Sequence, residues 1–499
     1  MNEGFDGGRR FFIALVEAER DRQDEHDGGW VIFDSIAESL CEDLCDMQDF
    51  HPRYFNAKEG LLLLRARVDE LPNGQQWLDR ANGTWVRIQV HAASGELPQA
   101  EVVLFGPADG EPPRVGLEIM KEKPSLSIIR YLDRFSMLAS ELRAPASLIS
   151  GVLDLALNDI NPDDIAIAAY DVGQGNCNAI VDEFEHPRIF FDLGWAPNFH
   201  SKSRPYDQPD FFNCDQLLGA PVVLSHWDMD HWCYAIQNST FNRGSLTTAH
   251  SWKPAALKRF WIARAPQKKK HKIGALTMAF YDELKNTYMF HGLSAILLWP
   301  KNAKKISFSF GWLEACCQSG VAPDDRNNNG IAMFVRPTPR APGILLTGDA
   351  YFESIPSLYS KIPLAGLVAP HHGAAVTPGY IPAPAPGSPA RLVMSVGAHN
   401  TYGHPKQASI NGYNAQGWVS SRTQDRFGCI CKTGSLVHSH GNSLLKFNVG
   451  PDPKCRCSCV PSGNLCLLPS TLAFPKPIAG VKPLKKSGNK KSAKAGSPV

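Results

Sequence analysis

Short apolar runs that end in polar residues recur along the chain between residues 165 and 449. They are rich in branched side chains and too short for helices, so they predict buried strands. Helical periodicity predicts helices at 275–285 and 351–360. This order, with polar residues at the strand ends, predicts two sheets packed face to face with helices outside. The strands are expected at residues 165–170, 179–181, 189–191, 222–224, 331–335, 344–347, 367–369 and 392–396.

The first 150 residues have a different pattern. Amphipathic runs at 11–22, 30–47 and 126–142 predict helices, and residues 101–105 predict a strand. We therefore expect an α+β accessory domain over residues 1–155. A catalytic domain is expected at 160–450, and a Cys-containing segment with a disordered basic tail at 451–499.

Composition narrows the class of protein. The chain has 499 residues, 43% hydrophobic and 20% charged, and a net charge of +2, as in soluble globular proteins. This charge alone makes no case for a nucleic-acid partner. There is no signal-peptide pattern and no apolar run of about 18 residues, so a cytoplasmic protein outside the membrane is expected.

Four ligand-type side chains follow the apolar run 221–224 within a few positions. Carboxylates and imidazoles crowded at a strand end are costly to bury unless a divalent cation binds them. The segment therefore predicts a metal site, and the alternative is a polar loop with incidental histidines. The four residues are His226, Asp228, Asp230 and His231.

Further polar residues follow other predicted strands, and together the segments resemble the metallo-β-lactamase superfamily. Within it, they resemble the hydrolase domain of ComEC-like competence proteins. The resemblance covers about residues 165–450 and implies an α/β fold, the αββα sandwich of that superfamily, with the α+β accessory domain before it. The matching segments are Asp-Val-Gly-Gln-Gly at 171–175, Ser-His-Trp-Asp-Met-Asp-His at 225–231, Leu-Leu-Thr-Gly-Asp at 345–349, Pro-His-His-Gly at 370–373 and Tyr-Gly-His-Pro at 402–405.

The resemblance also implies metal ligands. By position, His226 and Asp228 would hold a first ion, Asp230 and His231 a second, and Asp349 would bridge them.

One histidine of the pair His371 and His372 would complete the second site. We favour His371, which directly follows the strand, and keep His372 as the alternative. Asp171 would orient the ligand loop from behind the ligands.

One departure from the superfamily affects the first site. Most members carry a further histidine before the bridging aspartate, whereas this chain has the asparagine segment 327–329 there, as in the competence-type subfamily. The first site is then one protein ligand short. We expect one or two Zn²⁺ ions, with Mn²⁺ as the alternative because an aspartate stands at position 228.

The expected reaction is hydrolysis, because a divalent cation makes a bound water acidic enough to supply hydroxide near neutral pH. A phosphodiesterase or nuclease using a metal-bound hydroxide is favoured, with nucleic acid or a small phosphodiester as substrate. Asp230 would accept a proton from the water. His404 would protonate the leaving oxygen or hold a phosphate, unless it caps the helix expected near Pro405. The basic run 268–272 favours a nucleic acid, although such runs are usually solvated loops.

Two other functions stay open. One is a small-molecule hydrolase acting on a lactone, thioester or cyclic nucleotide, with Trp195, Trp227 and Trp232 lining its pocket. The other is an effector module of a bacterial defence or signalling protein, whose N-terminal domain binds a protein partner.

The cysteines near the C-terminus form a separate cluster. Cys429, Cys431, Cys455, Cys457 and Cys459 are spaced as C-x-C. This spacing differs from the C-x-x-C of common zinc folds, so unpaired thiols compete with a structural zinc site.

Overall fold

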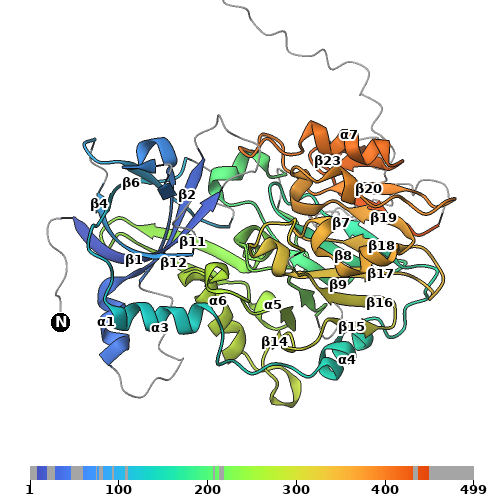
Figure 1. Ribbon diagram of the computed structural model, residues 1–499, viewed down its shortest axis with the longest axis horizontal. Coiled ribbons are helices and arrows are strands. Elements are labelled where there is room, and N and C mark those ends of the chain that lie inside the picture. The colour runs from blue at the N-terminus through green and yellow to red at the C-terminus, as the bar shows by residue number, and fades with distance from the viewer. Residues whose placement is uncertain are drawn as a thin grey trace, which may run out of the picture.

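Three β-sheets form most of the molecule in the computed structural model (Figure 1). An eight-stranded sheet lies at the left of Figure 1, and two seven-stranded sheets lie at the right. The structure describes residues 8–19, 29–46, 60–74, 76–77, 83–92, 95–106, 111–205, 208–212, 219–317, 319–430 and 436–448.

The first six strands close into an antiparallel barrel. Their order is β3-β2-β1-β4-β6-β5, and pairing of β5 with β3 completes the circle. The strands are β1 (Arg9–Glu19), β2 (Trp30–Ala37), β3 (Leu61–Arg67), β4 (Trp85–Ala92), β5 (Gln99–Val102) and β6 (Arg114–Ile119).

The predicted helix at 11–22 is wrong, as is the first part of the one at 30–47. Both are barrel strands buried on two faces. Phe12 and Val16 of β1 fill the barrel interior, and Ile13 and Leu15 pack on its outside. A strand buried on both faces shows a continuous apolar run with no alternation, which periodicity alone cannot separate from a helix.

A hairpin from the middle of the chain extends this sheet. Strands β11 (Ile236–Asn242) and β12 (Thr247–Trp252) pair with each other, and Thr248 of β12 pairs with Leu61 of β3. The hairpin starts a few residues after His231. It therefore ties the barrel directly to the segment that was predicted to bind metal.

The two seven-stranded sheets pack face to face over a shared apolar core. Ile167 and Phe191 contribute from the first sheet, and Met333 and Leu346 from the second. The first sheet contains β7 (Ala166–Ala169), β8 (Cys177–Val181), β9 (Pro187–Leu193), β10 (Val222–Val223), β13 (Trp261–Ala263), β14 (Ile296–Leu298) and β24 (Ser443–Leu445). The second contains β15 (Lys305–Phe308), β16 (Gly311–Ala315), β17 (Ile331–Val335), β18 (Gly343–Leu346), β19 (Leu364–Val368), β20 (Arg391–Met394) and β21 (Val419–Arg422).

The predicted fold class, an αββα sandwich with an α+β accessory domain, is wrong. The accessory region is a closed antiparallel barrel, and helices do not form the two outer layers. The outer face of the first sheet shares its core with the barrel, α3 and α6. Phe352, Ile355 and Tyr413, from short 3-10 turns and α7, cover the second sheet. Within the described ranges, the α-helices include α1 (Glu38–Asp46), α3 (Leu126–Ser136), α4 (Ala146–Ala156), α5 (Pro254–Leu257), α6 (Ala275–Asn286) and α7 (Gln407–Ala415).

The helix predicted at 351–360 is a pair of 3-10 turns, Phe352–Ser354 and Pro356–Ser360. Pro356 lacks a backbone N–H and cannot continue an α-helix through this point. Among the described residues, no helix is both long enough and apolar enough to cross a membrane.

Candidate metal centre

The candidate ligands lie on loops that follow strands of both seven-stranded sheets. The 3-10 turn Met229–His231 follows β10 of the first sheet, whereas Asp349 and the turn Pro370–Gly373 follow β18 and β19 of the second. Because β18 and β19 are parallel, their carboxyl ends meet at one edge of the second sheet, which brings Asp349 and His372 together. The loop after β10 reaches them from the first sheet, with His231 Nε2 3.2 Å from Asp349 Oδ1.

The backbone of these loops is tightly constrained. Gly348 has φ +56°, and a Cβ there would lie 2.5 Å from the Cβ of Ser225. His371 and His372 both adopt left-handed φ values of 48° and 54°. Non-glycine residues in this region are strained, and such strain clusters at functional sites.

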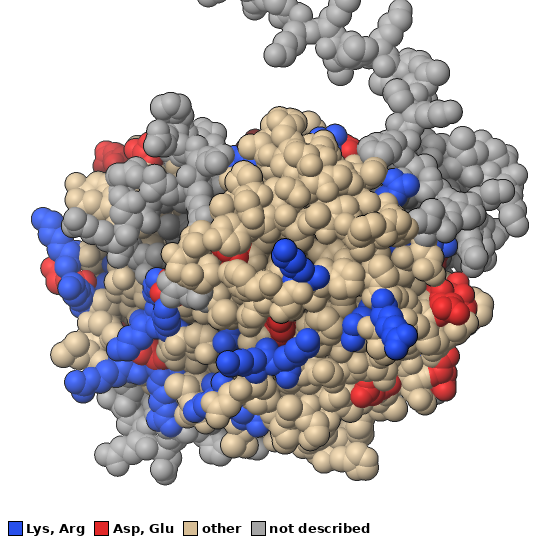
Figure 2. Space-filling model, turned by 45° about the vertical axis from the view of Figure 1, so that its right-hand side comes forward, with Lys and Arg blue, Asp and Glu red and all other residues tan. Residues whose placement is uncertain are grey.

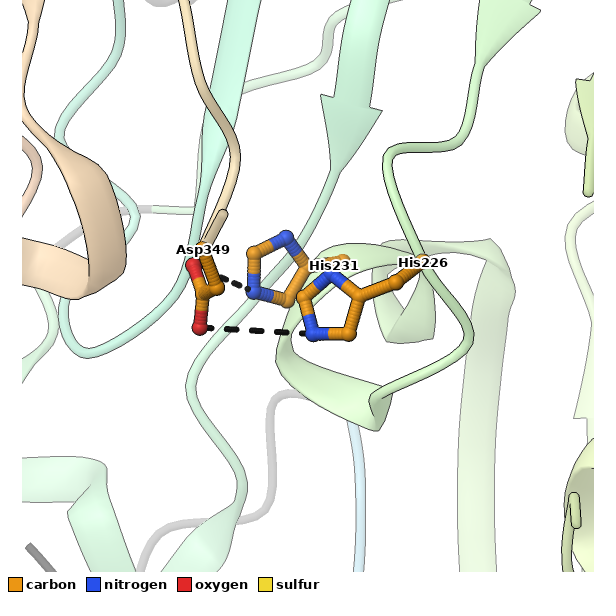
Figure 3. A group of neighbouring side chains, drawn as sticks. All are labelled: His226, His231 and Asp349. Atoms are coloured by element: carbon orange, nitrogen blue, oxygen red, sulfur yellow. Dashed lines mark ion pairs between the residues drawn. The ribbon is translucent and has the colours of Figure 1, made fainter. Parts of the chain in front are cut away.

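Two buried histidines point toward the carboxylate of Asp349 (Figure 3). His231 Nε2 lies 3.2 Å from Asp349 Oδ1, and His226 Nε2 lies 4.0 Å from Asp349 Oδ2. One ligand atom from each residue falls within 4.8 Å of the others. This group could hold a metal ion.

A second group shares one histidine with the first. His231 Nε2 lies 3.6 Å from Asp230 Oδ1, and His372 Nε2 lies 3.1 Å from Asp230 Oδ2. These three residues also offer ligand atoms within 4.8 Å of one another. His372 Nε2 lies 3.7 Å from Asp349 Oδ1, so this aspartate faces both groups.

The two neighbouring histidines face different oxygens of Asp349. His372 is buried, and its Nδ1 donates to the Ser395 carbonyl at 2.7 Å, which leaves Nε2 toward Asp230. His371 is 28% exposed, and its Nε2 lies 3.6 Å from Asp349 Oδ2. The structure therefore brings His372 into the Asp230 group, where we had favoured His371, and places His371 at the outer oxygen.

The unsatisfied atoms of the centre fit a metal ion. Nε2 of His226, Nε2 of His231 and Oδ1 of Asp349 are buried and have no hydrogen-bond partner within the described parts of the chain. Leaving such atoms unpaired costs free energy. Imidazole nitrogens and carboxylate oxygens are the donors that zinc and similar cations bind.

Asp192, at the end of β9, orients the imidazole ring of His231. Asp192 was not predicted to have this role. Its fully buried Oδ2 lies 2.8 Å from His231 Nδ1, which fixes the tautomer with Nε2 free for a metal. It also accepts hydrogen bonds from Ser225 N and Oγ and from Asn176. Asp192 has φ +62° and precedes Gly194. A polar residue and a glycine at the end of an apolar strand were the signal available in the sequence.

Asp228 is held by an arginine that was also not predicted. Its Oδ1 lies 2.7 Å from an Arg326 guanidinium nitrogen, and its Oδ2 lies 3.2 Å from His226 Nε2. Burial opposes the charge of Asp228, but Arg326 and His226 outweigh it and lower the carboxyl pKa. Arg326 also pairs with Glu17 of barrel strand β1 at 2.9 Å. Asp228 thus belongs to neither of the two three-residue groups described above.

Asp171 bonds to residues other than the candidate ligands. Its carboxylate accepts hydrogen bonds from Arg426 and from the backbone N–H groups of Gly173 and Gly441. None of these partners is a predicted ligand. Asp171 orders the loop after β7, whereas contact with a ligand imidazole comes from Asp192.

His404 stands beside the exposed edge of the centre. Its ring centroid lies 5.7 Å from that of His371 and 5.8 Å from that of Tyr402. Helix α7 begins at Gln407 with Lys406 at its N-cap and no side-chain cap bond. His404 therefore does not cap this helix.

The charges in the centre shift one another's pKa. Burial disfavours the charged form of His231, but the carboxylates of Asp349 and Asp230 outweigh it and raise its pKa well above the ordinary value. The pKa of His372 is raised for the same reason. Burial also opposes the charge of Asp349, yet the neighbouring histidines hold its pKa well below the ordinary value.

The basic run 268–272 and the three tryptophans predicted to line a pocket make contacts typical of structural residues. Lys268 and Lys270 both pair with Asp324, at 2.6 and 2.9 Å, so the basic run is partly neutralised. Trp232 is fully buried and stacks on Phe280. Trp195 and Trp227 are also buried.

The C-terminal cysteines lie largely outside the described residues. A hairpin of β22 (Phe427–Ile430) and β23 (Leu436–His440) contains position 429. Positions 431, 455, 457 and 459 fall outside the described ranges.

Comparisons with known proteins do not identify a family for this chain. No family model and no curated protein match it. Among solved structures, it is similar to a mutant of CmlA beta-hydroxylase, with 9% sequence identity over 82% of this chain and 74% of that chain and a TM-score of 0.29. A likeness at this score carries no argument about this chain.

Proposed function

We propose that this chain is a metal-dependent hydrolase of the metallo-β-lactamase type, related to the ComEC-like hydrolase domains, that cleaves phosphodiester bonds. The observation that carries the proposal is the convergence of five buried or half-buried ligand side chains on three loops, one from the first seven-stranded sheet and two from the second. Its second support is the motif order, which resembles that superfamily. The five side chains are His226, Asp230, His231, Asp349 and His372.

A bound Zn²⁺ or Mn²⁺ ion would be held by these residues and would act as a Lewis acid that acidifies water. The chain's own residues would then orient the reaction. Asp192 keeps His231 Nε2 directed at the ion, and the Ser395 carbonyl does the same for His372. Asp230, 29% exposed at its side chain, can both hold the ion and accept a proton.

His404 is proposed to serve the leaving group. It lies next to the more exposed His371 and beside Tyr402, on the rim of the centre. An imidazole there can donate a proton to a leaving oxygen or hydrogen-bond a phosphate oxygen.

A nucleic-acid substrate is supported by the surface charge. Lys and Arg gather over the left and centre of the lower half of the face drawn in Figure 2, whereas Asp and Glu are more frequent at its right-hand side. A surface of this kind suits a polyanionic backbone. The pairing of Lys268 and Lys270 with Asp324 favours the second candidate, a small-molecule hydrolase acting on a lactone, thioester or cyclic nucleotide.

The domain division and a role of the barrel in binding a partner are also proposals. The hairpin β11–β12 crosses the proposed boundary, because it lies in the barrel sheet while its residues belong to the 160–450 segment. A sensing barrel in a defence or signalling protein would therefore be mechanically joined to the candidate centre.

The test is hydrolysis by the full chain after metal removal and reloading with Zn²⁺ or Mn²⁺. Substrates are single-stranded DNA, duplex DNA, RNA and bis-(p-nitrophenyl) phosphate, beside a lactone and a thioester. We expect metal-dependent cleavage of phosphodiesters, abolished by Asp349→Asn and retained by Asp69→Asn, a change at an exposed ion pair. Turnover of the lactone or thioester alone would favour the second candidate. Absence of metal-dependent turnover would contradict the proposal.

A further inference from the structure

We propose that the centre holds a single metal ion, because Arg326 occupies the place of the second cation beside Asp228. This inference rests on the proposed function, since it concerns the metal that the hydrolase would use. It adds a positioning role for Arg326 and, through Glu17, for the barrel.

The two ligand groups share one atom. Both need Nε2 of His231, because its Nδ1 is bonded to Asp192 at 2.8 Å. A single nitrogen lone pair binds one ion at a time. The two groups are therefore alternatives, and they cannot both be complete in one molecule.

The Asp230 group is closer to ligand spacing than the His226 group. Asp230 lies 3.1 Å from His372 Nε2 and, through its other oxygen, 3.6 Å from His231 Nε2, while Asp349 Oδ1 lies 3.2 and 3.7 Å from His231 Nε2 and His372 Nε2. Ligands at zinc bond lengths in a tetrahedron lie roughly 3.3 Å apart. In the other group, His226 Nε2 lies 4.0 Å from Asp349 Oδ2. The Asp230 group, with Asp349 beside it, is therefore the one that we expect to be filled.

Positive charge on the other side of Asp349 disfavours a second ion. The Asp228 carboxylate is ion-paired with Arg326 at 2.7 Å, so its negative charge is already compensated. The pocket next to His226 is lined by two guanidinium groups, those of Arg264 and Arg326. A second dication bound here would be repelled by both.

Arg326 is held in place by several hydrogen bonds. Two of its nitrogens lie 2.9 Å from the two carboxylate oxygens of Glu17, and one donates to the Lys272 carbonyl at 3.0 Å. Bidentate arginine–carboxylate pairs fix the guanidinium in one orientation. The barrel thereby keeps the positive charge beside Asp228, and a metal ion could displace it only by breaking this pair.

The experiment counts metal in the full chain. Metal-free protein is dialysed against Zn²⁺ or Mn²⁺, and bound metal is measured by elemental mass spectrometry. We expect one ion per chain in the wild type and in Asp228→Asn. We expect weaker binding in His372→Ala, which lacks a ligand of the Asp230 group and keeps only the alternative group.

A second readout does not depend on stoichiometry. A single bound Mn²⁺ gives the electron paramagnetic resonance spectrum of an isolated ion, whereas two ions bridged by Asp349 give a spin-coupled spectrum. Arg326→Met should bind a second ion more weakly than the first. Glu17→Gln keeps the guanidinium but loosens it, so this variant should also bind some of a second ion.

The outcomes separate the two proposals. Two ions in the wild type, with one lost in Asp228→Asn, would overturn the single-ion inference and leave the hydrolase proposal in place. No bound metal in a folded wild type would contradict the hydrolase proposal itself, and the inference with it. One ion in the wild type that Asp228→Asn removes would also overturn the inference, since the ion would then sit on the Arg326 side.

Discussion

Replacement of Asp192 by asparagine tests whether the carboxylate behind His231 positions the metal ligand. Asp192 is fully buried and accepts four hydrogen bonds, from His231 Nδ1, from N and Oγ of Ser225, and from Asn176 Nδ2. Asparagine has almost the same shape but offers only one accepting oxygen. Its amide nitrogen must therefore face at least one donor.

The expected cost follows from this count. If the remaining oxygen keeps the three donors that now meet Oδ2, the Ser225 backbone N–H loses its partner, which costs about 1–3 kcal/mol. The three retained bonds lose the assistance of charge, at roughly 0.5–1 kcal/mol each. We expect a loss of about 2.5–6 kcal/mol in the free energy of unfolding and a roughly 10–100-fold loss of metal affinity.

Asp182→Asn is the matched control. Asp182 is also buried and accepts backbone hydrogen bonds from Phe184 and His186. It follows the end of β8 that lies away from the centre, since the opposite end, at Cys177, pairs with Leu193 next to Asp192. Urea denaturation and competition with a chromophoric chelator measure stability and metal affinity. Both variants should be less stable, and only Asp192→Asn should bind metal more weakly. Equal metal affinity in Asp192→Asn and wild type would refute the positioning role.

Three further predictions concern protons and metal. Burial lowers the pKa of Lys253, whose ammonium lies over the Tyr234 ring, to about 7, so stability should rise with pH by about 2–3 kcal/mol between pH 7 and 9. Lys253→Met should remove this rise, as followed by urea denaturation at each pH. Metal binding near neutral pH should release protons, because His231 and His372 have raised pKa values. Calorimetry in two buffers with different ionisation enthalpies detects this, and identical heats would contradict it. Chelation should lower the Tm of the wild type but not of Asp349→Asn.

The sequence could predict much of the metal centre because its ligands are written locally. The strands predicted at 222–224, 344–347 and 367–369 are confirmed within a few residues, and the candidate ligands lie in the loop after each of them. The barrel could not be predicted in the same way, because strands buried on both faces lose the alternation that marks a strand.

The residues around the ligands were harder to predict for a different reason. Arg326 and Glu17 are more than 300 positions apart, and their pairing depends on how the barrel packs against the sheets. No local pattern marks such a pair. The choice between His371 and His372 likewise depends on two left-handed backbone positions that the sequence does not reveal.

The hairpin β11–β12 attaches the middle of the chain to a barrel that is already closed. Strand β3 pairs with β2 on one side and with β5 on the other, and β12 adds one further pairing at its start, between Thr248 and Leu61. A fragment ending near residue 155 would therefore keep all six barrel strands paired and would leave uncovered only the start of β3. In the complementary fragment, by contrast, β12 would lose the strand that it pairs with outside its own hairpin.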